Sequence, residues 1–412
     1  MSVLEFDEAL AVVLEHARGL GAPGSVETVA LRDAVGRVLA EEVRADRDQP
    51  PFARATRDGF AVRASSFSEG VELRVVGEVR AGQRWVGGPV GAGEAVKIMT
   101  GAPVPSGADA VAMVEFVEVG SGTVKTVAER GLVAGENVVA RGAEAGVGQA
   151  VIAAGVVVGA AEIGLAATCG RAELVVYKQP MVSILATGDE LVEVGSGAEL
   201  EEQQIWNSNG HALRALVSGA GGFPGKLAIA RDTLVDVEER VAQGRAWDLM
   251  ILSGGVSMGE YDLVEEVLAG LGAEFFFTGV KMQPGKPVVF GRLPERDGAK
   301  ACYFFGLPGN PVSTQVTFHC FVEPFLRAMA GDVVEGPAFV QATLTEDVAG
   351  KAGLMRMLPA RWTRDRVRPE VRLVPWQGSG DLAANARANC YAVLPPREGE
   401  FVAGEPISVL LR

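Results

Sequence analysis

The sequence predicts a multidomain fold that combines a doubly wound α/β domain with separate β domains. Residues 178–330 alternate strand-length apolar runs with amphipathic helical patterns, which is typical of a mostly parallel sheet with helices on both faces. Segments on either side hold short valine-rich runs between glycines and prolines, a pattern typical of β domains. A length of 412 residues exceeds what a single hydrophobic core usually organises, so we expect several domains.

The order of these patterns divides the chain into four domains. Helical patterns near the N-terminus and over residues 151–170 predict a discontinuous helical linker domain, which a strand at 174–177 closes. The predicted boundaries are 1–45 with 145–177 for the linker domain, 46–144 for an inserted β barrel or sandwich, 178–330 for the α/β domain and 331–412 for a small C-terminal β domain.

Apolar periodicity predicts the individual elements. We expect N-terminal helices over 3–20 and Leu31–Ala40, and inserted strands at Val71–Val76, Ala95–Ile98, Ala110–Val117 and Gly122–Val127. Strands of the α/β domain are predicted at Met181–Ala186, Lys226–Ala230, Asp248–Ser253, Glu274–Val280, Pro287–Gly291 and Ala301–Phe305. Its helices are predicted at Asn209–Ser218, Leu234–Gln243, Tyr261–Leu271 and Pro311–Ala330.

Composition excludes several classes of protein. With 48% hydrophobic and 22% charged residues the chain is expected to fold, and a net charge of −14 argues against nucleic-acid and membrane partners. There is no basic and apolar leader, and the longest apolar run, 151–161, is too short for a bilayer, so we expect a cytoplasmic protein. Cysteine and histidine spacing indicates no zinc site, and Cys302 and Cys320 lie in apolar runs typical of the core.

Polar or glycine-rich turns follow four of the predicted strands. They are Thr187-Gly188-Asp189-Glu190, Arg231-Asp232, Ser253-Gly254-Gly255 and the turn ending in Asn310. Because the carboxyl ends of parallel strands meet at one edge of a sheet, these turns are expected to form a ligand site. The glycine pair precedes a helical pattern, so backbone N–H groups, with the hydroxyls of Ser253 and Ser257, suit an anion. A plain turn is the alternative for each of them alone.

The same edge carries the carboxylates Asp189, Glu190, Asp232, Glu260 and Asp262. Carboxylates on flexible turns suit Mg²⁺, which completes its coordination with water and substrate phosphate. A structural alternative is that Asp189 and Asp232 cap the helices that follow them.

Two further turns add candidate groups to this edge. Pro284-Gly285 sharpens the turn before Lys286, whose ammonium can then supply a fixed positive charge, although a surface lysine is the alternative. Asn310 is expected to cap the last helix of the domain, with the Ser313 hydroxyl in its first turn.

Together these turns resemble the molybdopterin-binding domain shared by molybdopterin adenylyltransferases and molybdopterin molybdenumtransferases. The resemblance rests on Thr187–Leu191, Ser253–Asp262, Pro284–Pro287 and Leu307–Ser313. Segments outside that domain, namely Arg57–Val62, Ile98–Pro105, Arg141-Gly142 and Gln377–Ser379, are similar to the molybdenumtransferases, whereas the adenylyltransferase is a single small domain. The resemblance covers essentially the whole chain.

This resemblance implies an elongated homodimer of four-domain subunits with a cleft shared between subunits. It implies insertion of molybdate into adenylylated molybdopterin with Mg²⁺ and release of AMP. The catalytic residues it implies, combined with the residue chemistry, are Asp58, Thr100, Glu190, Asp232, Asp262, Lys286 and Ser379, with Glu190, Asp232 and Asp262 as metal ligands. Asp58 and Thr100 match positions that reach the cleft of the partner subunit. Substrate-binding candidates are Thr187, Gly188, Asp189, Ser253, Gly254, Gly255, Ser257, Gly259, Pro284, Gly285, Asn310 and Ser313.

The chain departs from the family pattern at two places. Glu144 ends an Arg-Gly-Ala-Glu segment where the family has Arg-Gly-Glu-Asp. Gly279 and Gln283 stand where the family often has basic residues, and Lys281 is a candidate to supply the missing positive charge. Three alternatives remain open, namely an ATP-using molybdopterin adenylyltransferase, a molybdopterin-binding scaffold, and insertion of tungstate. The adenylyltransferase is also a candidate partner.

Overall fold

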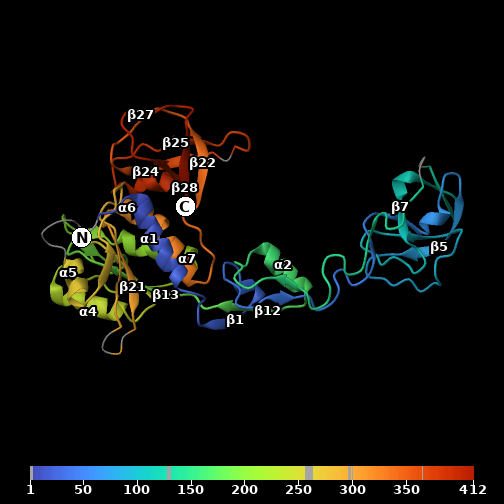
Figure 1. Ribbon diagram of the computed structural model, residues 1–412, viewed down its shortest axis with the longest axis horizontal. Helices are drawn as coiled ribbons and strands as arrows, with labels where there is room; N and C mark the ends of the chain where they lie inside the picture. Colours follow the sequence, from blue (N-terminus) through green and yellow to red (C-terminus); the bar gives the residue numbers. More distant parts are fainter. Residues whose placement is uncertain (1–2, 128–130, 256–262, 296–297, 299, 364) are drawn as a thin grey trace. The chain divides into compact units, whose positions relative to one another are not determined.

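In the computed structural model the chain forms two compact units, and the structure describes residues 3–127, 131–255, 263–295, 298, 300–363 and 365–412 (Figure 1). The first unit comprises residues up to Thr28, Gly36–Ala40 and Val175–Arg412, and the second comprises Val29–Val35 and Glu41–Leu174. Strands β1 (Val26–Ala30) and β12 (Glu173–Tyr177) span the division. The four-domain division stays a prediction, and helix α1 lies in the first unit.

The first unit is built on a six-stranded sheet. Its strands, in spatial order, are β16 (Phe223–Lys226), β13 (Met181–Ala186), β17 (Leu249–Ser253), β21 (Cys302–Leu307), β20 (Val289–Leu293) and β18 (Glu274–Phe277). Strands β16, β13, β17 and β21 pair in parallel, and β20 runs antiparallel to both of its neighbours. The predicted doubly wound, mostly parallel sheet is therefore confirmed.

Helices cover both faces of this sheet because successive side chains of each strand point to opposite sides. Alternate residues of β17 show the division, since Leu249 and Ile251 join one buried cluster and Met250 and Leu252 join the other. The first face packs against α1 (Phe6–Gly19), α3 (Ser208–Gly219), α6 (Pro311–Thr317) and α7 (Glu323–Met329), and the second packs against α4 (Leu234–Gly244) and α5 (Leu263–Gly270).

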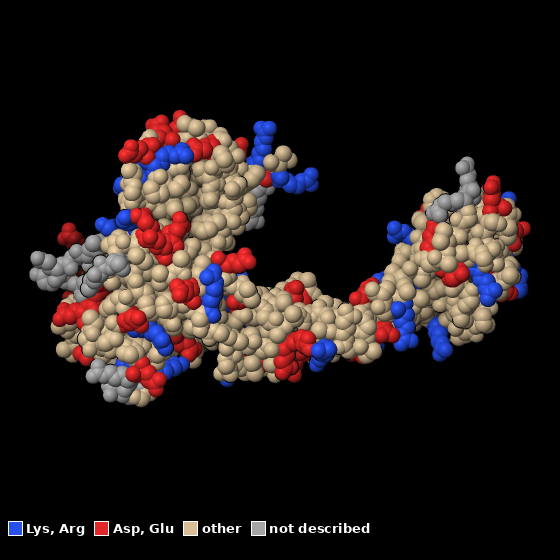
Figure 2. All heavy atoms as spheres, in the orientation of Figure 1, with Lys and Arg blue, Asp and Glu red and all other residues tan. Residues whose placement is uncertain are grey.

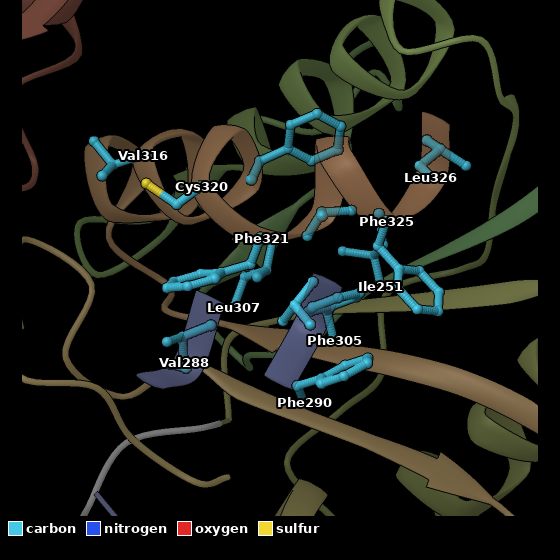
Figure 3. Close-up of a cluster of buried hydrophobic side chains, with 14 of the residues drawn as sticks. Ile251, Val288, Phe290, Phe305, Leu307, Val316, Cys320, Phe321, Phe325 and Leu326 are labelled. Carbon is cyan, nitrogen blue, oxygen red and sulfur yellow. The ribbon is translucent and has the colours of Figure 1, made fainter. Parts of the chain in front are cut away.

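An aromatic-rich core joins the sheet to the last helices of the α/β region. Figure 3 shows Phe290 and Phe305 of the sheet facing Phe321 and Phe325. The Phe290 and Phe305 rings stack with centroids 4.5 Å apart. The predicted continuous helix at 311–330 is interrupted by a π-helical turn over Phe318–Val322. This turn ends two residues before Pro324, which lacks an N–H to continue the helical hydrogen bonds.

The C-terminal strands close into a small barrel. The barrel strands β24 (Met355–Trp362), β25 (Glu370–Leu373), β22 (Phe339–Leu344), β28 (Pro406–Leu411) and β26 (Cys390–Leu394) follow in spatial order, and β26 pairs back onto β24. Shorter elements of this unit are β14 (Leu191–Val192), β15 (Ile205–Trp206), β19 (Met282–Gln283), β23 (Val348–Ala349), β27 (Glu400–Phe401) and helix α8 (Leu382–Arg387).

The second unit contains the predicted β module. Its six-stranded sheet runs β7 (Ala110–Met113), β4 (Gly59–Val62), β6 (Glu94–Ile98), β5 (Glu72–Val79), β9 (Thr123–Thr126) and β8 (Val117–Val119). Buried clusters form from alternating residues of these strands. The other elements of this unit are β2 (Val43–Arg44), β3 (Arg54–Ala55), β10 (Val138–Val139), β11 (Ala150–Ile152) and α2 (Ala160–Thr168), with 3-10 turns at Leu31–Asp33, Ala64–Ser66 and Val114–Phe116.

Three local predictions were wrong. The helix expected at Leu31–Ala40 is a single 3-10 turn over Leu31–Asp33, and the helical pattern of 151–170 becomes a helix at Ala160 after the strand β11. The strand expected at Lys226–Ala230 lies earlier, at Phe223–Lys226. This strand is at the sheet edge, where Pro224 is tolerated because one side of the strand needs no ladder hydrogen bond.

Charged side chains are spread over the surface in both signs. On the face that Figure 2 shows, acidic and basic side chains are interspersed on both units.

Candidate functional site

A pocket of about 880 Å³ opens at the carboxyl edge of the central sheet. Because β13, β16, β17 and β21 are parallel, the segments that follow them meet at this edge. Eight of the predicted residues line the pocket, namely Thr187, Gly188, Glu190, Asp232, Ser253, Gly254, Gly255 and Asn310. The predicted convergence of four strand ends is therefore seen in the structure.

A reciprocal pair of backbone hydrogen bonds joins two of the acidic turns. The Asp189 N–H donates to Asp232 Oδ2 and the Asp232 N–H donates to Asp189 Oδ1, each at 3.4 Å. Arg231 Nη1 lies 3.8 Å from the same Asp189 oxygen. These contacts hold the turn after β13 against the turn before α4, so that two carboxylates from distant parts of the sequence come together.

Gly188 allows a third carboxylate to fold over the same turn. A Cβ atom at Gly188, whose φ is +146°, would lie 2.5 Å from Glu190 Oε2. The Glu190 carboxylate therefore occupies space that any other residue at position 188 would fill.

The helix-capping alternative for these acids is wrong. Thr233, not Asp232, caps α4, since its hydroxyl accepts a hydrogen bond from the Asp236 N–H at 3.3 Å. Asp189 precedes the short strand β14 rather than a helix. Neither carboxylate caps a helix, and of the two only Asp232 lines the pocket.

The glycine pair after β17 brings two loops into close contact. Gly254 and Gly255 have φ of +93° and +63°, and a Cβ at Gly254 would lie 2.6 Å from the Thr187 carbonyl oxygen. The Gly254 N–H is not free for an anion, as the sequence suggested, because it donates to the Leu307 carbonyl at 3.2 Å. These glycines therefore serve close packing of the pocket floor, and Gly254 contributes no free donor.

The start of helix α3 forms a wall of the pocket that the sequence analysis missed. Asn207, Ser208 and Asn209 all line it. Asn207 caps α3 by accepting from the Gly210 N–H at 2.9 Å, and Asn209 Nδ2 donates to Ser253 Oγ at 2.9 Å and to the Gly309 carbonyl at 2.7 Å. An asparagine directly before a helical pattern is a capping signal, but its two long-range contacts have no local signature.

A second wall comes from elsewhere in the unit. This wall includes the β14–β15 pair, through Leu191, Ile205 and Trp206. The rest of the lining comes from other strands, helices and loops, namely Ala186, Val237, Leu263, Val264, Pro287, Pro308, Gly309, Pro311, Gly380 and Leu382. Apolar side chains on β14 and β15 thus stand in a pocket that also carries acids, which suits a ligand with both a ring and charged groups.

Helix α6 begins at the pocket and connects it to the C-terminal barrel. Asn310 stands at its N-cap position as predicted, but its side chain makes no capping hydrogen bond. The Val312 N–H donates to the Ser379 carbonyl at 2.9 Å, which places the predicted Ser379 beside this helix start. Ser313 is buried in the helix and is absent from the pocket lining.

The turn of Pro284, Gly285 and Lys286 is not part of the pocket lining. A Cβ at Gly285 would lie 2.5 Å from Thr317 Cγ2, so this turn packs tightly on α6. Lys286 is exposed and does not line the pocket, whereas the next residue, Pro287, does.

Asp58 and Thr100 are paired within the second unit. The Thr100 N–H and hydroxyl both donate to Asp58 Oδ1, each at 2.7 Å. These hydrogen bonds, the backbone one first, lower the pKa of Asp58. The structure thus shows a carboxylate held by two hydrogen bonds from Thr100, while its approach to a partner subunit stays a prediction.

Comparisons with known proteins match the whole length of the chain. The MoeA N-terminal region (domain I and II) matches residues 4–170, a probable molybdopterin binding domain matches 183–328, and the MoeA C-terminal region (domain IV) matches 341–411. The molybdopterin molybdenumtransferase of Staphylococcus aureus strain Mu50 is 35% identical over 391 residues, covering 93% of this chain and 90% of that protein. The chain belongs to the MoeA family.

Two further relatives agree with this assignment. The molybdopterin molybdenumtransferase of Haemophilus influenzae is 32% identical over 415 residues, covering 99% of this chain and 98% of that protein. The crystal structure of the molybdopterin biosynthesis moeA protein from Pyrococcus horikoshii OT3 superposes with a TM-score of 0.81 at 28% identity, covering 100% of both chains. This MoeA-family chain is therefore a transferase of molybdenum cofactor biosynthesis, and its predicted fold class and family resemblance are confirmed.

The departures from the family pattern have structural partners. Glu144 pairs with Arg54 at 2.9 Å, and Lys281 pairs with Glu5. Gln283 Oε1 accepts from Lys351 Nζ at 3.3 Å, so a basic group from the C-terminal strands stands beside the glutamine. Because Lys281 is engaged with Glu5, Lys351 is the better candidate for the missing positive charge near Gln283.

Some predicted residues cannot be placed. Ser257, Gly259, Glu260 and Asp262 lie outside the described residues. Among the residues that the structure does describe, no three histidine, cysteine or acidic side chains converge as a metal cluster, and no helix is long and apolar enough to cross a membrane. The four cysteines are free and buried, and burial raises the pKa of Cys302 to about 12, as expected for core residues and not for nucleophiles.

Proposed function

We propose that this protein inserts molybdate into adenylylated molybdopterin with Mg²⁺ and releases AMP. In that reaction water adds across the link between the two phosphates, so that this link breaks and AMP leaves. The two dithiolene thiols replace two oxygens of molybdate, which depart as water with the thiol protons and two protons from solvent. The observation that carries the proposal is the pocket where Glu190 and Asp232 stand together with Ser253 and the start of α3.

The acidic residues suit a magnesium site. Glu190 and Asp232 line the pocket, and Asp189 is tied to Asp232. One or two carboxylates are the usual protein contribution to Mg²⁺, with phosphate oxygens and water completing the shell. Glu190 and Asp232 would hold Mg²⁺, which would neutralise charge on the phosphate oxygens. Asp262 remains a third candidate from sequence.

Other residues of the pocket bind and orient the substrate. The N-terminus of α3 carries the positive end of the helix dipole, and its first residue, Ser208, lines the pocket, which favours phosphate or molybdate oxygens there. In an acidic chain such a local donor surface is what allows an anionic substrate to bind. Catalysis by fixed donors and charge requires no protein nucleophile, which agrees with the buried cysteines.

We also propose a homodimer in which Asp58 and Thr100 complete the cleft of a partner subunit. The paired geometry of Asp58 and Thr100 supports this role, because a carboxylate held by two hydrogen bonds keeps one oxygen available outward. A cytoplasmic location and contact with the molybdopterin adenylyltransferase belong to the same proposal.

Purified protein mixed with adenylylated molybdopterin, Mg²⁺ and molybdate tests the proposal. We expect release of AMP that depends on both molybdate and Mg²⁺, with tungstate run in parallel to compare the two oxyanions. A control with unadenylylated molybdopterin and ATP tests for the adenylyltransferase reaction. Absence of AMP in the first mixture would refute the proposed reaction.

A further inference from the structure

Two polar atoms at the pocket are buried without a hydrogen-bond partner. Among the described residues, none bonds to Thr187 Oγ1 or Asn209 Oδ1. Both residues line the pocket. Buried polar atoms in folded proteins are nearly always hydrogen-bonded, so two orphans on one pocket indicate partners that a ligand supplies.

The orientation of the Asn209 amide is fixed by the protein. Its Nδ2 donates both hydrogens, one to Ser253 Oγ at 2.9 Å and one to the Gly309 carbonyl at 2.7 Å. A carbonyl oxygen only accepts, so turning the amide over would put two acceptors 2.7 Å apart at Gly309. Asn209 Oδ1 is therefore a fixed acceptor with no freedom to become a donor.

The Thr187 hydroxyl is held in a comparable position. Thr187 is 4% exposed, and its N–H donates to the Ser253 carbonyl at 3.1 Å. A Cβ at Gly255 would lie 2.8 Å from Thr187 Oγ1, and one at Gly254 would lie 3.0 Å from it. The glycine pair thus leaves space beside the hydroxyl that any side chain would fill.

The unpaired acceptor of Asn209 requires a hydrogen-bond donor, and this requirement identifies the part of the ligand that contacts it. Asn209 Oδ1 needs a donor, whereas phosphate and molybdate oxygens and the carboxylates of the pocket accept hydrogen bonds at neutral pH. In adenylylated molybdopterin, the ring N–H and amino groups are donors that can hydrogen-bond to Asn209 Oδ1 at the pocket wall. Leu191 and Ile205 supply apolar lining for such a ring.

We propose that Asn209 is a specificity-determining residue whose Oδ1 accepts a hydrogen bond from an N–H group of the substrate's planar heterocycle, with the Thr187 hydroxyl as a second unpaired group on the same pocket. This inference rests on the proposed function, because the heterocycle belongs to that substrate. Pterin and adenine both carry an exocyclic amino group that could donate this hydrogen bond. The binding comparison below distinguishes the two rings.

Ligand pairs that differ in the donor provide the test. Binding of AMP is compared with purine riboside 5′-monophosphate, which lacks the amino group, and binding of pterin with 2-dimethylaminopterin, by calorimetry without Mg²⁺. We expect wild type to favour the donor-bearing member of one pair about tenfold, the ratio for one neutral hydrogen bond with a buried acceptor. The pair that shows this ratio identifies the ring.

Protein variants combined with the ligand pairs form a double-mutant cycle, which tests whether Asn209 and the ligand's donor interact directly. In Asn209→Ala the ratio is expected to fall below about twofold, Thr187→Val is expected to reduce it, and Thr187→Ser to retain it. A reduced folded fraction weakens binding of both ligands alike and leaves their ratio readable, and Thr187→Val serves if Asn209→Ala does not fold at all. Asn389→Ala is the matched control, since Asn389 also bridges two backbone groups, the N–H and carbonyl of Trp362, away from the pocket.

Two results would overturn the inference. One is a ratio near one for both pairs in wild type, which is also expected if Asn209 Oδ1 meets a metal ion instead of a ring. The other is discrimination that survives in both Asn209→Ala and Thr187→Val. Since these ratios need no turnover, they are independent of the AMP-release assay, whose failure would concern the proposed reaction.

Discussion

Replacing Gly254 by alanine separates backbone strain from steric overlap at the pocket floor. Its φ of +93° is unfavourable for an L residue by about 1–2 kcal/mol, and the new Cβ would meet the Thr187 carbonyl oxygen at 2.6 Å. Overlap with backbone, which cannot rotate away, adds about 1–3 kcal/mol. The expected total is about 2–5 kcal/mol, or a fall in Tm of about 4–20 °C at about 2–4 °C per kcal/mol.

Gly195→Ala is the matched control. Gly195 has a φ of +82°, and a Cβ at this position would meet nothing within 4 Å, so the substitution should cost the backbone term alone, about 1–2 kcal/mol. Thermal unfolding of both variants is followed by circular dichroism at one scan rate, and AMP release is measured at a temperature where both are folded. Equal falls in Tm for the two variants would refute the argument that the turn after β17 is packed against β13.

Three further predictions follow from named groups. Asp232→Asn keeps an acceptor oxygen for the Asp189 N–H, so Tm should change little, while loss of the charge should lower the rate of AMP release by at least roughly 10²-fold; an unchanged rate would remove Asp232 from the site. Thr100→Val removes one of the hydrogen bonds that depress the pKa of Asp58, so the pKa rises and the acid limb of the kcat/KM profile should move to higher pH, whereas an unmoved limb would mean that it reports another group. Burial raises the pKa of Cys302 to about 12 and of Cys390 to about 11, so iodoacetamide at pH 8 should label neither thiol before unfolding, and rapid native labelling detected by mass spectrometry would contradict their burial.

The pH dependence of the Asp58 prediction has a definite sign. Its pKa is lowered in the folded chain, so the carboxylate favours folding above the ordinary pKa, and this contribution is lost as pH falls through the lowered value. Removing the Thr100 hydroxyl shifts that loss to higher pH. The backbone N–H of Thr100, the larger cause, remains in the variant, so the shift should be partial.

Much of the α/β fold was predictable because the local periodicity of apolar residues indicates its strands and helices. The strand at Met181–Ala186 was predicted with its observed bounds, and Leu234–Gln243 differs from α4 by one residue. An apolar run of strand length between turn residues carries this information within a few positions. The predicted position of the edge strand differs from the observed Phe223–Lys226 because Pro224 and Gly225 interrupt its apolar pattern, and pairing with β13 sets where the strand lies.

The functional edge was predictable to the extent that it consists of strand ends. Glu190, Asp232 and Ser253 each follow or end a strand, so the parallel order alone brings them to one edge. Asn209 was missed because its role depends on Ser253 and Gly309, which are 44 and 100 residues away. From local sequence alone Asp232 could have capped helix α4, but in the structure the hydroxyl of Thr233 makes the capping hydrogen bond.

By itself the sequence determined the fold class, the family and the turns that carry chemistry, because these depend on residue type and short spacing. Only the tertiary structure decided which backbone donors are free, as at Gly254, and which polar atoms remain unpaired, as at Thr187 and Asn209. Hydrogen bonds between loops join residues far apart in the chain, so their partners depend on how the strands are ordered and packed. The physical reason is that each donor or acceptor can make only a few hydrogen bonds, and which partners it takes is fixed only when all of its neighbours in the fold are in place.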